Sequence, residues 1–363
     1  MRLVRGSQIC ELSLEGAFVR LDGELQPHDS PESASAAFAD ELARRHAAGF
    51  VEAPDVVDDY DARLVYADEL QLRGDPLGEL IAVQHALATM SDLVPAQRRK
   101  LQRRVHGLLD EQHDNLFGPL APYVQRPSRP ALARPALEVT WHMGFADEVL
   151  LRRIPQLDLH EIYAHLRELP IGGLVTKLVF AEQSLPQQWV ERGSYVELVR
   201  TMSKLGVPPH LRALVLGAVP QRLRAGIEVG DLRPVLAASP TLEELEVHGG
   251  GGYVGALISP RLRKLTLDGV MLELAESNLP SLVELTLMNT GRTWLVHSLL
   301  DSELLGQLRS LVLRRCGLDT SHLDMIVRDA DRFAHLERFD VRGNPLSRYA
   351  VNEARKRLPR LRA

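Results

Sequence analysis

The sequence predicts an α/β protein in which a solenoid of stacked parallel strands follows a small α+β head and a helical module. Two observations carry this prediction. A fixed apolar pattern recurs between residues 175 and 341, and a chain of 363 residues exceeds what one ordinary core holds. A content of 45% hydrophobic and 25% charged residues is typical of a folded protein, so the chain is expected to be ordered over most of its length.

Residues 1–53 are predicted to form short strands followed by a helix. ICELSLEG and AFVRLDG alternate apolar and polar residues around Glu15-Gly16, which predicts a hairpin. The tail AFADELARRHAAGFVEA, after a strand pair, resembles the end of the WGR domain, a module known from nucleic-acid-dependent enzymes. Where the Trp-Gly-Arg triplet is expected, residues 20–23 are RLDG, and the segment has nine acidic residues against five arginines. The resemblance therefore implies a degenerate module, kept as a fold or for contacts with protein.

Residues 54–117 are predicted to form a helical module. An apolar face on residues 64, 67 and 70 precedes Gly74, and Asp75-Pro76 supplies a cap and a first-turn proline for a second helix. DARLVYADELQLRGDPLGELIAVQ resembles the bacterial repeat-companion domain, a family with no established activity. The matching residues are Arg63, Leu64, Tyr66, Ala67, Asp68, Leu70, Arg73, Gly74, Asp75, Pro76, Gly78, Glu79 and Gln84. Glu69 stands where an aromatic residue is usual in that family.

Three segments follow this module. Residues 118–135 contain five prolines and are predicted to be a linker. Residues 136–174 include LEVTWHMGFADEVLLRR, which predicts a strand pair around Met143-Gly144 that caps the first open end of the solenoid. Residues 175–363 hold the repeats.

The repeat is the pattern LxxLxL, in which the last two apolar residues alternate with polar ones as in a strand with one buried face. Its intervals are 36, 31, 20, 20, 26 and 28 residues, and LRSLVLRRCGL and LERFDVRGNPL add Cys316 and Asn344 at the turn. The copies begin at Val175, Leu211, Leu242, Leu262, Leu282, Leu308 and Leu336. This half resembles the leucine-rich-repeat family, which implies parallel strands on the concave face and helices on the convex face.

The concave face is the predicted binding surface, because solenoids commonly bind partners there. The side chains on the first strands of this face are apolar, those on the middle strands are acidic and those on the last strands are basic. This mixture favours a protein partner over nucleic acid. The candidate contact residues are Lys177, Val179, Val215, Glu244, Glu246, His248, Lys264, Asp268, Glu284, Met288, Arg314, Arg338, Asp340 and Arg342.

A nucleic-acid-sensing regulator is the first alternative. It would use the WGR-like segment together with the candidate contacts Arg98, Arg99, Lys100, Arg103 and Arg104 in QRRKLQRR. On a helix these five cations spread around much of the circumference, and no aromatic residue is interleaved. A solvated helix face, or a strip that docks an acidic partner, is the favoured interpretation.

No complete catalytic or metal motif is present, so we expect no catalytic residues, no metal and no cofactor. HEIYAH, from His160 to His165, spaces its histidines by five residues, whereas zinc proteases need a spacing of four to place both on one helix face. His248 precedes a glycine run that leads to no phosphate-binding lysine. The hypothesis is a non-enzymatic adaptor or sensor, and a cryptic metal-dependent hydrolase at His160 or His248 is the second alternative.

Composition also predicts the compartment. The net charge of −5 gives no general attraction for phosphate or an anionic membrane, and Cys10 and Cys316 are too few for a disulfide framework. The N-terminus has no apolar signal region, and no segment reaches the roughly 18 apolar residues that span a bilayer. We therefore expect a cytoplasmic protein with no membrane partner.

Overall fold

The structure is a computed structural model. It describes residues 60–363 except 130–134, 155, 170, 173–174, 182–194, 219–226 and 292–294, and before them residues 2–5, 8–15, 18–21, 24–27, 30, 33, 36–37, 40–41, 44 and 51–52. The chain divides into two compact units. One is Met1–Leu116 with His142–Gly144, and the other is Phe117–Trp141 with Phe145–Ala363.

The first unit begins with a five-stranded antiparallel sheet of order β4-β3-β2-β1-β5. Its strands are β1 (Arg2–Arg5), β2 (Gln8–Glu15), β3 (Phe18–Leu21), β4 (Glu24–Pro27) and β5 (Val51–Glu52). The predicted hairpin is confirmed, because β2 pairs with β3 and Glu15 lies opposite Phe18. Residues 33, 36–37, 40–41 and 44 are helical. Residues 22 and 23, part of the RLDG segment at the expected triplet, lie outside the described residues.

The helical module follows. Its helices are α2 (Tyr60–Leu72), α3 (Pro76–Thr89), α4 (Pro95–Glu111) and α5 (His113–Phe117). The predicted start of the second helix is confirmed, because the side chain of Asp75 accepts a hydrogen bond from the Leu77 amide at 2.9 Å and Pro76 occupies the first turn. Both features satisfy or remove amide donors that a helix start leaves without partners.

Residues of the repeat-companion-like segment hold the turn at His142–Gly144, which belongs to the same compact unit. Gln84 Oε1 accepts a hydrogen bond from the Gly144 amide at 2.7 Å, and a guanidinium nitrogen of Arg63, which is 4% exposed, lies 3.4 Å from the His142 carbonyl oxygen. Gly144 has φ of 77°, and a Cβ there would lie 2.1 Å from Ile81 Cγ1. A larger residue is therefore excluded both by backbone conformation and by space.

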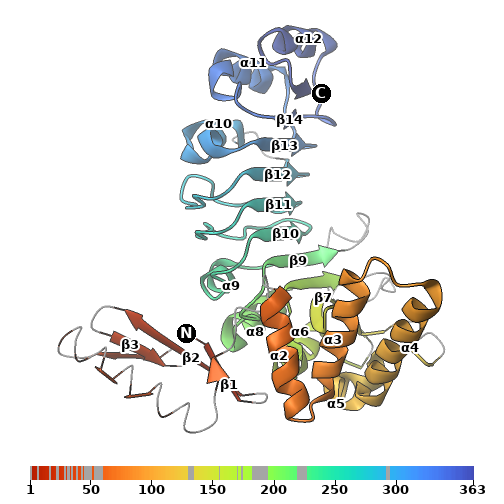
Figure 1. Ribbon diagram of the computed structural model, residues 1–363. Coiled ribbons are helices and arrows are strands. Elements are labelled where there is room, and N and C mark those ends of the chain that lie inside the picture. The colour runs from red at the N-terminus through yellow and green to blue at the C-terminus, as the bar shows by residue number, and fades with distance from the viewer. Residues whose placement is uncertain are drawn as a thin grey trace. The chain divides into compact units, whose positions relative to one another are not determined.

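The second unit is built on a ten-stranded sheet of order β15-β14-β13-β12-β11-β10-β9-β8-β7-β6. Strands β7 to β15 pair in parallel, each with the next along the chain, and stack as successive rungs in Figure 1. The strands are β6 (Leu137–His142), β7 (Phe145–Arg152), β8 (Lys177–Ala181), β9 (Ala213–Ala218), β10 (Glu244–His248), β11 (Lys264–Asp268), β12 (Glu284–Met288), β13 (Ser310–Arg314), β14 (Arg338–Asp340) and β15 (Leu361–Arg362). The predicted strand pair around Met143-Gly144 is present as β6 and β7 and ends this stack.

The core is a set of stacked leucine rows. The first apolar residue of every LxxLxL copy, from Val175 to Leu336, is at most 1% exposed. Within the strands, Leu245, Leu265 and Leu285 lie side by side and are equally buried. A single strand cannot bury its apolar face alone, so it is the stack that excludes water from these side chains. Burying each leucine stabilises the fold by about 1.5–3 kcal/mol.

The structure of the connections between strands depends on the number of residues from one repeat copy to the next. The helices are α6 (Leu159–Glu168), α8 (Val196–Leu205), α9 (Arg233–Ala237), α10 (Leu295–Asp301), α11 (Thr320–Arg328) and α12 (Arg348–Arg357), with 3₁₀ turns η4 (Glu303–Gln307) and η5 (Ala330–Arg332). Residues 249–263 and 269–283, all described, contain no helix. Helices were expected on the convex side throughout, but a 20-residue interval is too short for one. The bridges Tyr253↔Met271 and Ile258↔Asn278 stack these segments instead.

Asn344 and Cys316 occupy the turn positions that the repeat predicts. Asn344 Oδ1 accepts hydrogen bonds from the amides of Cys316 and Leu318 at 2.8 and 3.1 Å. Its Nδ2 donates to the carbonyls of Leu313 and Val341 at 2.7 and 2.6 Å. Cys316 is fully buried, and burial raises the pKa of its thiol. One amide side chain thus satisfies four backbone groups where the chain leaves two strands.

The segment expected as a linker is partly folded. Residues Gly118–Tyr123 form the 3₁₀ helix η1, in which Leu120 is fully buried. Val124 then forms a parallel bridge with Leu137. Among the described residues, no helix has the length and apolar character that a bilayer crossing requires.

Candidate functional site

The candidate site is one face of the repeat sheet, which we call the open face. Its side chains alternate with the buried leucines and fall into three rows across the strands. The first row is Glu148, Lys177, Ala213, Glu244, Lys264, Glu284, Ser310 and Arg338. The second row is Leu150, Val179, Val215, Glu246, Thr266, Thr286, Val312, Asp340 and Arg362. The third row is His248, Asp268, Met288 and Arg314, continued by Arg342 two residues after Asp340.

The first row carries the most exposed charges. Glu244, Lys264, Glu284 and Arg338 are exposed, and Lys177 is half-buried. Lys264 Nζ lies 3.4 Å from Glu244, and Lys177 Nζ lies 2.7 Å from Glu148. Such exposed pairs contribute little stability, about 0–1 kcal/mol each. They remain available to exchange partners with another molecule.

Four predicted contact residues are buried rather than open. Val179, His248 and Asp268 are 7%, 6% and 4% exposed, and Asp340 is completely buried. Alternation correctly assigned them to this face, but neighbouring side chains cover the polar ones. His248 and Asp340 hold other side chains of this face in place, as described below. Of the remaining predicted contacts, Glu246, Val215, Met288 and Arg314 are half-buried, and Arg342 is exposed.

A series of polar contacts crosses the middle rungs of the open face, which are strands β10 to β12. His248 Nε2 lies 2.5 Å from Glu246 Oε1, and its Nδ1 lies 3.3 Å from Asp268 Oδ2. Asn289 Nδ2 donates to Asp268 Oδ1 at 2.5 Å. The contact with His248 lowers the pKa of the Glu246 carboxyl, although burial acts in the opposite direction. Both ring nitrogens are engaged by carboxylates, so the imidazole ties two rungs of the open face together.

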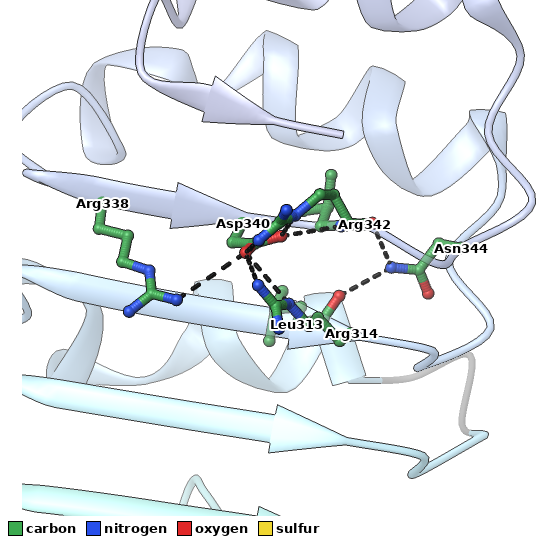
Figure 2. A network of polar contacts seen from close by, with 7 residues as sticks. Leu313, Arg314, Arg338, Asp340, Arg342 and Asn344 are labelled. Atoms are coloured by element: carbon green, nitrogen blue, oxygen red, sulfur yellow. Dashed lines mark hydrogen bonds and ion pairs between the residues drawn. The ribbon is translucent and has the colours of Figure 1, made fainter.

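The late rungs hold an arginine cluster around Asp340, shown in Figure 2. Asp340 accepts hydrogen bonds from Arg314 Nε at 3.1 Å, from Arg314 Nη2, and from Arg342 Nη2 at 2.8 Å. The Arg342 amide also donates to Asp340 at 3.1 Å, and Arg338 Nη2 lies 3.9 Å away. Burial alone raises the pKa of Asp340, but the hydrogen bonds from Arg342 and Arg314 outweigh it and hold the pKa well below its ordinary value.

Beside this cluster the open face is hollowed into a pocket of about 400 Å³. It lies where β11 to β14 end. Its lining residues are Asp268, Met288, Asn289, Arg314, Arg315, Arg342 and Gly343. The sequence prediction named four of these seven and missed Asn289, Arg315 and Gly343, each of which directly follows a residue of the third row.

The cationic helix predicted as a possible nucleic-acid contact is α4. Arg104 makes a two-pronged ion pair with Glu79 of α3, at 2.6 and 2.5 Å, and also lies 3.3 Å from Glu111. The Arg99 and Arg103 guanidinium groups donate to carbonyls of their own helix at 3.2 and 3.4 Å. Arg98 is half-buried and lies 3.4 Å from the Leu87 carbonyl, while Lys100 is exposed. Arg104 therefore joins two helices, and its charge is paired with those of Glu79 and Glu111.

The histidines considered for metal chemistry lie on one helix and one strand. His160 and His165 both lie on α6 and are half-buried, and His248 is on β10. Across the residues that the structure describes, no group of three or more His, Cys, Asp or Glu side chains is arranged to hold a metal ion.

Comparisons with known proteins add little. No protein-family model matches the chain, and no curated protein matches it. Among solved structures, the chain is similar to a crystal structure of a Bacteroides fragilis protein determined as a structural genomics target, with 13% identity and a TM-score of 0.40. That alignment covers 100% of this chain and 95% of the other. At such a score the likeness supports no argument, so the description as a solenoid-like α/β protein rests on the strands and their pairing.

Proposed function

We propose that this chain is a non-enzymatic adaptor or sensor, a leucine-rich-repeat protein that binds a partner protein through its open face. The observation that carries the proposal is the arrangement of charge on that face. The exposed acidic side chains Glu244 and Glu284 lie on β10 and β12, on either side of Lys264. The late strands carry basic side chains at Arg314, Arg338 and Arg342. A partner with the opposite sequence of charges would be oriented along the stack, from the middle strands to the late ones.

The composition of the open face also favours a protein partner. Between the charged side chains lie the half-buried Val215, Thr266, Thr286 and Met288. A centre poor in charged residues, surrounded by a polar rim, is the usual composition of a protein interface. A nucleic-acid partner would instead need a continuous cationic track, and carboxylates interrupt this face on the middle rungs.

Site-specific photo-crosslinking tests this proposal. A photoreactive residue placed at Glu284, in full-length protein in its native lysate, is expected to capture one partner protein. A matched probe at Asp324, an exposed residue of α11, is the control and should not capture it. The double variant Glu244→Lys with Glu284→Lys is expected to lose the partner in affinity capture. Glu246 is left unchanged, since its contact with His248 makes it part of the fold.

Two outcomes would contradict the proposal. Equal capture at Glu284 and Asp324 would mean that the open face is not the binding surface. Recovery of nucleic acid, with steep loss on raising the salt concentration, would favour the nucleic-acid-sensing alternative. The hydrolase alternative would require turnover of a substrate together with a bound metal, which elemental analysis of the purified protein measures.

A further inference from the structure

The pocket at the ends of β11 to β14 has the chemistry of an oxyanion site. Arg314, Arg315 and Arg342 contribute to its lining, and Arg338 lies next to Arg314 and Arg342 around the same carboxylate. Two aspartates offset part of this charge, namely the buried Asp340 that the arginines bind and Asp268 in the lining. Four arginines and two aspartates leave a formal excess of two positive charges. A volume of about 400 Å³ lies within the usual range for small-ligand sites.

Asp340 organises this cluster without using all of its donors. It binds Arg314 and Arg342 through the Nε and Nη2 groups of each guanidinium. A guanidinium carries five N–H donors, so each arginine keeps others for a second acceptor. The side chains of Arg314 and Arg342 are 35% and 52% exposed, so those donors can be reached from solvent. Because both side chains are already ordered, a ligand would lose little free energy in fixing them.

Arg315 is held at the pocket in an unfavourable backbone conformation. Its φ is 53°, in the left-handed region, whereas Gly269 and Gly343 occupy the equivalent position after β11 and β14 with φ of 73° and 80°. A non-glycine residue there costs about 1–2 kcal/mol. Gly343 also makes room for this side chain, because a Cβ on it would lie 3.0 Å from Arg315 Cγ. Glycine would fit the backbone at 315 better, which indicates that the guanidinium has a function of its own.

The Asp268 side of the pocket limits how a ligand can lie. Asp268 accepts from Asn289 Nδ2 at 2.5 Å and faces His248 Nδ1 at 3.3 Å, so both of its oxygens are engaged. Its charge would repel an anion that filled the whole pocket. An anion is therefore favoured on the arginine side, with the rest of the ligand toward Met288 and Asn289.

We propose that this pocket binds a phosphate monoester carried by a phosphorylated side chain of the partner protein, an inference that rests on the proposed function. A phosphate monoester has a charge of about −2 near neutral pH, which matches the excess of two positive charges. Its oxygens accept paired N–H groups from guanidinium, the residue type best suited to phosphate. A carboxylate has one charge and would leave the cluster under-neutralised.

Titration calorimetry of the full chain with phenyl phosphate tests the pocket without the partner. Phenyl phosphate is expected to bind more tightly than benzoate, and to bind more weakly at pH 5.5 than at pH 7.5, because its second proton leaves near pH 6. Arg315→Gly should weaken this binding by about tenfold or more, the loss of one charge-assisted hydrogen bond. It removes the strained backbone, so it should unfold at a urea concentration close to that of the wild type. Arg348→Ala, which removes an exposed arginine of α12 outside the pocket, should bind as the wild type does.

The same variant then tests the partner. Wild-type protein should capture the partner from lysate, whereas capture should fail with Arg315→Gly and with phosphatase-treated lysate. Benzoate binding as tightly as phenyl phosphate, or unchanged phenyl phosphate binding by Arg315→Gly, would overturn the proposal. So would equal capture of the dephosphorylated partner. That last result would leave the open-face binding intact, since the crosslink at Glu284 tests it separately.

Discussion

Asp340→Asn is the substitution that best tests how the late rungs are held together. Asp340 is completely buried and is the shared acceptor for Arg314 and Arg342. Asparagine has nearly the same size, but it replaces one charged oxygen by an amide that points its own hydrogens at a guanidinium. The change therefore removes the charge and about two charge-assisted hydrogen bonds without creating a cavity.

The expected loss of stability follows from the exposure of the partners. Hydrogen bonds to charged groups contribute about 1.5–3 kcal/mol each, so two of them give roughly 3–6 kcal/mol before correction. Arg314 and Arg342 are 35% and 52% exposed, so water replaces part of what they lose. We therefore expect a loss of about 2 kcal/mol in the free energy of unfolding. For a unit of this size, that corresponds to a fall in melting temperature of roughly 4–8 °C.

The pH dependence of this loss has a definite sign. The folded-state pKa of Asp340 lies below its ordinary value of 3.8, so the ionised carboxylate stabilises the folded chain at every pH above that value. The stabilisation is lost as the pH falls through the folded-state pKa, where the carboxyl takes up a proton. The difference in free energy of unfolding between wild type and Asp340→Asn should therefore be largest at pH 7 and should decrease below about pH 4.

Urea denaturation followed by circular dichroism, at pH 7 and at pH 3, measures both effects. Asp324→Asn is the matched control, because it makes the same change of side chain and charge at an exposed residue of α11. The control should change the urea midpoint little. If Asp340→Asn unfolds at the wild-type midpoint, or if its deficit at pH 7 persists unchanged at pH 3, Asp340 does not anchor the arginines through its charge.

Three further outcomes follow from buried contacts. Asn344→Ala should lower the free energy of unfolding by about 2–4 kcal/mol, since several backbone groups at the turn lose their partner, and a urea midpoint within error of wild type would contradict this. Cys316 should resist alkylation by iodoacetamide in the folded chain and react only in urea, as followed by mass spectrometry, because burial raises its pKa and shields it. Gly144→Ala should lower the melting temperature by several degrees, because a Cβ there would meet Ile81 at 2.1 Å, and the same change at the exposed Gly306, which has open space around it, should not.

The repeat core was predictable because it depends on a local rule. A strand with one buried face must place apolar residues two apart, and stacking them needs the same spacing in every copy. Leu245, Leu265 and Leu285 obey both conditions and pack in register. The roles of Asn344 and Cys316 followed from the same repeat. The missing helices on the 20-residue intervals could also have been predicted, since so few residues cannot hold a strand, two turns and a helix.

Burial of the polar residues was not predictable from alternation. The two-residue period says which face a side chain occupies, and it says nothing about what its neighbours on that face do. Asp340 sits on the open face and is nevertheless completely buried, with two long arginine side chains bonded to it. His248 and Asp268 are covered in the same way on the middle rungs. Side-chain pairing across rungs depends on register, which aligns residues 20 to 28 positions apart.

The pocket itself left a signal in the sequence, at the second residue after each LxxLxL. That residue is Gly249, Gly269, Asn289, Arg315 and Gly343 in the last five copies. Glycine and asparagine suit a turn that needs positive φ, and the structure gives φ of 54° at Asn289 and 53° at Arg315. Arginine has no such local justification. Arg315 thus adopts a backbone conformation that glycine adopts at lower cost, and its side chain lines the pocket.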